Sequence, residues 1–134
     1  MPTDDLFFTA ALAAELGKKT GLCWVRVGGR SHPVWHVWHD DVLCLVSGGD
    51  EQPLLELVDG DRVEVVMRSK ETGGWLLTWD GQVSVVHPGD ERWSTTTSAL
   101  VAGRLNLADP ATAAAAWARS STVHRIAPVH PPTR

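Results

Sequence analysis

The spacing of hydrophobic positions changes several times along the chain, and these changes divide it into strands and helices. Segments with period-two alternation or uniform apolarity predict short strands. They cover residues 22–27, 32–39, 42–46, 62–68, 75–81, 82–86 and 121–129. Gly- and Asp-rich stretches separate them, including a tight turn expected at Asp80-Gly81. Consecutive strands joined by such turns favour an antiparallel, barrel-like sheet over a doubly wound parallel one.

Four segments instead show helical patterns. The first covers residues 3–16, with Thr3 as a cap and Gly17 as a stop. A short helix is expected after Asp50 and before Gly60, and two more cover 93–105 and 109–120. The predicted fold class is therefore mainly β (α+β), with about six or seven antiparallel strands and short flanking helices. A chain of 134 residues is expected to form a single domain, 1–134, with a frayed tail over 128–134.

Composition narrows the partners and the location. The formal net charge is −4 with both signs interspersed, so neither nucleic acid nor a membrane is an expected partner. No apolar segment reaches the roughly 20 residues of a membrane span, and Asp4 and Asp5 stand where a signal peptide is basic. Cys23 and Cys44 lie in apolar runs, which is typical of small buried hydrophobes in a reducing compartment. We expect a cytoplasmic protein.

The stretch HPVWHVWHDD, residues 32–41, is rich enough in histidine to suggest a metal site. In a strand, however, His32, His36 and Trp38 face one side, and Trp35, Val37 and His39 face the other. His32 and His36 would lie about 13 Å apart, too far to share one zinc ion. Asp40 and Asp41 are expected in a hairpin turn. The pattern therefore predicts no metal site, and no motif assigns a catalytic residue.

Two other stretches are candidate anion sites. Gly48 and Gly49 precede a predicted helix, whose first backbone N–H groups can bind an anion. Arg68, Ser69 and Lys70 end a strand, where two cations beside a turn suit a phosphate or carboxylate. The alternative for the second stretch is a solvated sheet edge with protective charges.

The order of these elements, with HPVWHVWHDD, VLCLVSGG and RVEVVMRSK in sequence, resembles the pyridoxamine 5′-phosphate oxidase-like family, the FMN-binding split β-barrels, over about residues 4–127. The resemblance implies that the second strand runs along a cofactor groove and that the loop after the next strand holds the flavin phosphate. It places Pro33, Val34, Trp35 and His36 at the groove, and Ser47, Gly48 and Gly49 in the loop. It also implies a homodimer with the cofactor at its interface.

The chain departs from the family pattern at the phosphate. Asp50, Glu51 and Gln52 stand where phosphate-binding members carry a cation, and the Arg/Lys pair common on the second strand is missing. Arg68 and Lys70, or Arg30, are the residues that could compensate. Substrate residues for pyridoxamine phosphate are not recognisable.

Three functions remain open. The first is an oxidoreductase that uses FMN or a deazaflavin to pass a hydride to a small substrate. The second is a non-catalytic protein that binds a flavin, haem or hydrophobic metabolite, with His36 or His39 as an axial haem ligand. A metal-dependent hydrolase ranks last.

Overall fold

The computed structural model of the chain describes residues 5–6, 10–19, 22–69, 75–104 and 109–129. The order of elements is β1 (Asp5–Leu6), α1 (Ala10–Lys19), β2 (Leu22–Val27), β3 (Arg30–Trp35), β4 (Val37–His39), β5 (Val42–Ser47), β6 (Arg62–Ser69), β7 (Trp75–Val86), α2 (Trp93–Gly103), α3 (Ala113–Ser120) and β8 (Thr122–Pro128).

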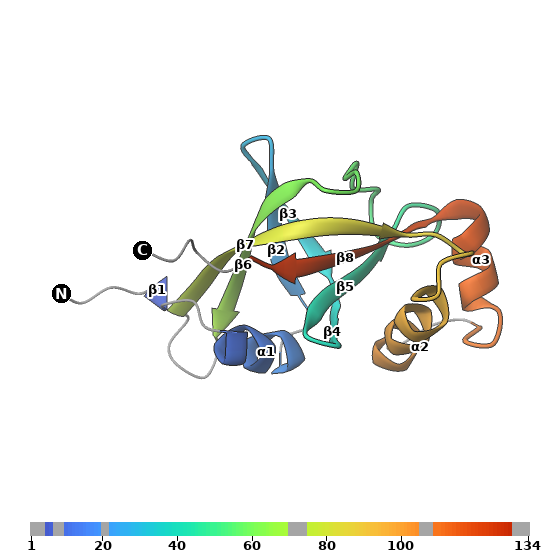
Figure 1. The fold of residues 1–134 in the computed structure, drawn as a ribbon, viewed down its shortest axis with the longest axis horizontal. Helices are drawn as coiled ribbons and strands as arrows, with labels where there is room; N and C mark the ends of the chain where they lie inside the picture. Colours follow the sequence, from blue (N-terminus) through green and yellow to red (C-terminus); the bar gives the residue numbers. More distant parts are fainter. Residues whose placement is uncertain (1–4, 7–9, 20–21, 70–74, 105–108, 130–134) are drawn as a thin grey trace.

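Within the described residues, seven antiparallel strands form one sheet in the order β3-β2-β6-β7-β8-β5-β4, and β1 pairs with β7 in parallel. The sheet coils into a half-barrel, with α1 near one end and α2 and α3 together at the other (Figure 1). β4 contacts both α1 and α2. The predicted fold class, mainly β with short helices, is confirmed.

The two edge strands, β3 and β4, are separated in sequence by His36 alone. Trp35 ends β3 opposite Leu22 of β2, and Val37 begins β4 opposite Cys44 of β5. The chain therefore joins the two edges covalently at His36, where the pairing with neighbouring strands changes. The single strand predicted over 32–39 is wrong in this respect, because its halves pair with different partners.

Two hydrophobic cores flank this segment. The larger core lies inside the half-barrel, where Val34 is buried and Trp38 packs against its other members. The second core lies between β5, β8 and the two C-terminal helices, and Trp35 and Val37 pack against it. Consecutive side chains thus alternate between the two cores through the bend at His36, as the period-two pattern predicted.

The short helix predicted after Asp50 is absent. Gly48 and Gly49 have φ of 86° and 63°, and residues 53–58 form neither helix nor strand. Leu55 and Leu57 are buried while Leu54 and Val58 are exposed, which is the period-two pattern of a segment laid across the core. Side chains hold its backbone: Ser47 Oγ accepts from Leu55 N–H at 3.1 Å, and Leu57 O lies 3.0 Å from His124 Nε2.

The turn predicted at Asp80-Gly81 is also absent, because β7 runs unbroken through both residues and pairs with β6 and β8. A Cβ on Gly81 would lie 2.3 Å from Ile126 Cγ2 of β8. Glycine is therefore needed for close packing between strands, and not for a turn.

Both ends of the chain differ from expectation. Asp5 and Leu6 pair with Leu76 and Leu77 instead of starting a helix, and α1 continues to Lys19, beyond Gly17. Thr3 lies outside the described residues. At the other end β8 includes Pro128, and Val129 N–H donates to Asp80 O at 2.8 Å. Among the described residues, no helix is both long and apolar enough to span a membrane.

Candidate functional site

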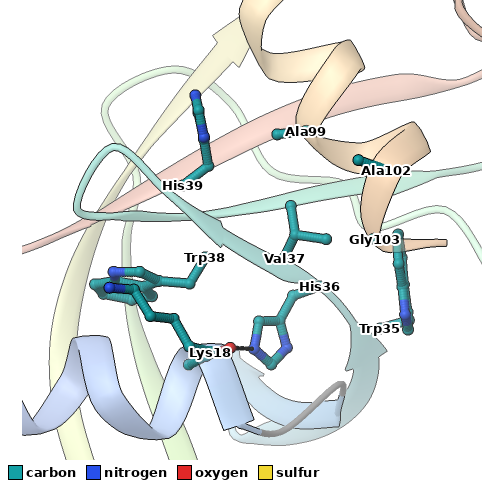
Figure 2. A pocket seen from close by; sticks show the side chains of 10 residues that line it. Lys18, Trp35, His36, Val37, Trp38, His39, Ala99, Ala102 and Gly103 are labelled. Carbon is teal, nitrogen blue, oxygen red and sulfur yellow. Dashed lines mark hydrogen bonds between the residues drawn. The ribbon is translucent and has the colours of Figure 1, made fainter.

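A pocket of about 450 Å³ lies along the edge strand β4, between α1 and α2. The β3–β4 segment contributes Trp35 through His39, α1 contributes Gly17 and Lys18, and α2 contributes three small residues, Ala99, Ala102 and Gly103. His36 and Trp38 point toward α1, while Val37 and His39 point toward α2 (Figure 2). The pocket therefore takes residues from both faces of the strand, which is possible because β4 is at the edge of the sheet.

Two glycines let the helices approach this strand. A Cβ on Gly17 would lie 2.6 Å from the Trp38 ring, and a Cβ on Gly103 would lie 2.3 Å from Val37 Cγ1. Gly17 thus serves the packing of α1 on Trp38, and the helix stop predicted there is wrong. Trp38 also meets Trp79 edge-on, with ring centroids 6.1 Å apart, which fixes one wall of the pocket.

His36 stands at the joint between β3 and β4 and is 2% exposed. Its Nε2 lies 3.3 Å from Gly17 O, and this contact ties the joint to the end of α1. Burial lowers the pKa of His36 from 6.5 to about 4, partly opposed by the backbone of Gly17 and Val34. Its Nδ1, like Trp38 Nε1, is buried without a well-formed hydrogen bond to the described residues. Two buried polar atoms of pocket-lining side chains therefore lack a well-formed partner within the described part of the chain.

Trp35 is held at its backbone by the side chain of Gln52. Trp35 N–H donates to Gln52 Oε1 at 2.7 Å, and Gln52 Nε2 donates to Trp35 O and to Val46 O, both at 3.0 Å. The side-chain amide therefore bridges the end of β3 and β5, and it bonds the backbone groups of Trp35 as a neighbouring strand would. In the sequence, Gln52 stands out as a residue at a place where phosphate-binding members carry a cation. Its bonds to the strand backbone could not be predicted from the sequence.

The Trp35 ring carries a cation on one side. The Arg104 guanidinium lies 5.4 Å from the ring centroid, and Arg104 forms an ion pair with Glu51. The Glu51 side chain is 8% exposed and that of Arg104 is 29% exposed. The guanidinium is thus engaged by both a carboxylate and an indole.

A second pocket, of about 360 Å³, begins at Arg104 and extends over α3. Three carboxylates line it together with that single guanidinium; they belong to Asp50, Glu51 and Asp109. Ala113, Ala116 and Trp117 form its apolar part. Trp35 lines the first pocket, Arg104 lines the second, and the two side chains stack, so this pair separates the pockets.

The residues expected to bind phosphate are engaged within the fold. Ser47 is fully buried and its Oγ is bonded to Leu55. Gly48 N–H donates to Gln52 O at 2.8 Å, and Gly48 O accepts from Ser121 Oγ at 3.0 Å. A Cβ on Gly49 would lie 2.9 Å from Ser120 O. Without the predicted helix, the helix-end donors expected at this loop are also absent.

The remaining predicted residues are dispersed. Val34 faces the barrel core at 2% exposure, while Pro33 is exposed on the outer face of β3. Arg68 is exposed near the end of β6, the Ser69 backbone pairs with Trp75, and Lys70 lies outside the described residues. Of the predicted set, Trp35 and His36 line the pocket. His39, named from the sequence as a possible haem ligand, also lines it, whereas Lys18 and the small residues of α1 and α2 were not predicted, because they come from other parts of the sequence and belong to no motif.

The chain is similar to known proteins in its fold. No family model matches the chain, and no curated protein matches its sequence. The FAD binding protein from Mycobacterium smegmatis has a similar structure, with a TM-score of 0.58 and 16% identity over 92% of each chain. HutZ, the haem storage protein from Vibrio cholerae, gives a TM-score of 0.59 and 14% identity over 90% of each chain. At these identities the similarity shows the fold alone, and together with the half-barrel sheet it confirms the split barrel expected from the sequence.

Proposed function

We propose that the chain binds the tricyclic ring of a flavin or deazaflavin in the pocket along β4, as a member of the pyridoxamine 5′-phosphate oxidase-like family. The observation that carries the proposal is the pocket itself. Its volume of about 450 Å³ falls within the usual range for small-molecule sites. Indole rings of Trp35 and Trp38 stand on the strand side, and small residues leave the α2 side open. A flat heterocycle suits such walls, because aromatic faces stack.

Polar groups for the ring are available at the same place. An edge strand has one side of its backbone without a strand partner, and β4 is the last strand of the described sheet. The carbonyl and N–H groups of a flavin can pair with such an edge. Lys18 is the one formal cation among the described lining residues, and no carboxylate accompanies it. An electron-rich or anionic ring edge is therefore favoured near α1.

When bound, a flavin or deazaflavin supplies hydride transfer, so the proposed activity is that of an oxidoreductase acting on a small molecule. The residues of this chain would stack on the ring, orient it through the strand edge and exclude water on the side of the two helices. FMN and the deazaflavins share the tricyclic ring with FAD, so the proposal covers all three. The similar fold of an FAD binding protein supports it.

We also propose that two copies pair, as the resemblance implies. Pro33, Trp24, Val66 and Thr78 form one row across the strands on the outer face of the sheet. Leu22, beside Trp35, is 48% exposed. This apolar row adjoins the pocket wall and supports a second subunit covering it. A cytoplasmic location is part of the proposal, since Cys23 and Cys44 are both free and buried.

Titration of riboflavin, FMN and FAD against tryptophan fluorescence tests the binding. We expect quenching at micromolar ligand. Ala102→Leu narrows the pocket from the α2 side, and we expect it to weaken binding about tenfold or more. Ala115→Leu, on the exposed face of α3, is the matched control and should bind as wild type does. Absence of binding of every flavin at about 100 times that concentration would refute the proposal.

Haem is the second candidate, and His39 is the observation that favours it. His39 lines the pocket and is partly exposed, whereas His36 is buried with Nε2 directed to Gly17 O. An axial ligand at this site would therefore be His39. On addition of haem we then expect a Soret band that His39→Ala removes and that His32→Ala, outside the pocket, retains.

A further inference from the structure

We infer that the pocket selects the flavin ring and disfavours a 5′-phosphate, and that Glu51 determines this specificity by holding Arg104 in an ion pair. This inference rests on the proposed function and specifies which form of the ligand the site accepts.

The first step concerns the groups available to a phosphate. If the ribityl phosphate of a bound flavin left the ring past Trp35, it would reach Arg104, which lies over the Trp35 ring, and then Asp50 and Glu51, which line the adjoining pocket. In the loop of residues 48–51, Gly48 N–H donates to Gln52 O and Glu51 N–H donates to Gly48 O. Just before the loop, Ser47 Oγ accepts from Leu55 N–H. Ser120 and Ser121 lie against Gly49. The loop is thus packed on its own chain: the N–H groups of Gly48 and Glu51 are already used as donors, and Ser47 Oγ is buried as the acceptor of Leu55 N–H.

The charge of the second pocket also disfavours a phosphate. Asp50, Glu51 and Asp109 line the pocket beyond Trp35 against one guanidinium, so the described residues there carry a net negative charge. A phosphate in that space would repel the carboxylates at short range, and the interaction is strong because Glu51 is 8% exposed. The first pocket has the opposite balance of charge, since its described lining residues include Lys18 and no carboxylate. An anion is therefore favoured near α1 and disfavoured near α3.

The third step identifies Glu51 as the determinant. The Arg104 guanidinium lies 5.4 Å from the Trp35 ring centroid, and a guanidinium at this place is a suitable partner for a phosphate. Its guanidinium is instead paired with Glu51. Neutralising Glu51 removes one negative charge and releases Arg104 at the same time. A single substitution should thus weaken the repulsion of a phosphate and free the guanidinium to bind it.

The test compares riboflavin with FMN, which differ by the phosphate alone. Both are titrated into wild type, Glu51→Gln and Glu56→Gln, and tryptophan quenching is followed. Glu56 is exposed on the segment that follows the loop of residues 48–51, lines neither pocket, and loses the same charge on substitution. We expect wild type to bind riboflavin at least as tightly as FMN. Glu51→Gln should bind FMN roughly tenfold tighter with riboflavin unchanged, and Glu56→Gln should match wild type.

Other results overturn the inference in distinguishable ways. If wild type binds FMN tenfold tighter than riboflavin, or if both glutamine variants change FMN binding alike, the inference fails while the proposed function stands. If no flavin binds, both fail. Should Glu51→Gln lose its circular dichroism signal, Asp50→Asn is the second variant, because Asp50 is exposed and lines the same pocket. Asp50→Asn should then tighten FMN binding in the same direction, and unchanged FMN binding would overturn the inference.

Discussion

At the scale of single residues, His36 connects the most parts of the molecule. It links the two edge strands along the chain, contacts the end of α1 through Gly17 O and lines the proposed ligand pocket. It does this as a neutral imidazole, because burial disfavours its charged form and no ion pair with a described carboxylate compensates. Its protonation should therefore report on the integrity of the joint.

The pH dependence follows from its pKa of about 4, which is below the ordinary 6.5 of an unfolded chain. Between these values the unfolded state binds more protons, so folding stability is complete above about pH 6.5 and falls as the pH approaches 4. The contribution of His36 to that loss is about 3 kcal/mol. Urea unfolding from about pH 7.5 to about pH 4.5 should show a steeper decline for wild type than for His36→Gln.

His124 is a second buried histidine whose titration must be separated from that of His36 in this measurement. Burial also lowers its pKa, so it contributes in the same direction, but it is present in both proteins and cancels in the difference. Parallel pH profiles of the two proteins would show that His36 does not carry this linkage.

At the scale of elements, the strands were predictable where exposure alternates along a single face. Residues 22–27 and 62–69 form strands close to the expected limits for that reason, and residues 42–47 do so as a uniformly apolar run that is buried throughout. The break at His36 and the continuity through Asp80-Gly81 depend on which strands become neighbours, and local pattern contains no such information. Residues 54–58 do alternate, and capping signals around them suggested a helix that tertiary packing does not form.

The candidate site could likewise be predicted only in part from the sequence. Trp35 and His36 belong to a dense aromatic motif and could be named from the sequence. Their partners Lys18 and Ala102 are placed beside them by the packing of α1 and α2, which is a tertiary property. The phosphate loop was expected from a resemblance whose cation is replaced here by Glu51, and the consequence became visible only with its pairing to Arg104.

A glycine pair tests the packing of elements directly. Gly81→Ala would place a Cβ 2.3 Å from Ile126, a fully buried and stiff β-branched side chain, so we expect a loss of about 2 kcal/mol in unfolding free energy. Gly89→Ala has open space around its Cβ and should change stability by less than about 0.5 kcal/mol. Chemical denaturation of the two variants measures both. Equal stability would mean that β7 and β8 do not approach as closely as described.

At the scale of the whole molecule, the half-barrel places its pocket beside the row of Pro33, Trp24, Val66 and Thr78 on its outer face. Trp35 joins the two: its neighbour across the strands is the exposed Leu22, and its side chain lines the pocket. A second subunit on the row of Pro33, Trp24, Val66 and Thr78 would therefore cover the strand whose end forms the pocket wall. Assembly and ligand binding are then expected to depend on each other.

Sedimentation equilibrium tests this coupling. We expect wild type to be a dimer and Trp24→Asp to be a monomer with an unchanged far-ultraviolet spectrum, because Trp24 is partly exposed and packs in neither core. A charge at the centre of an apolar interface costs several kcal/mol, enough to dissociate a dimer at micromolar concentration. The monomer should bind flavin at least tenfold more weakly. Ala115→Asp introduces the same charge on α3 and should remain a dimer. A monomeric wild type that binds flavin fully would separate the pocket from any subunit interface.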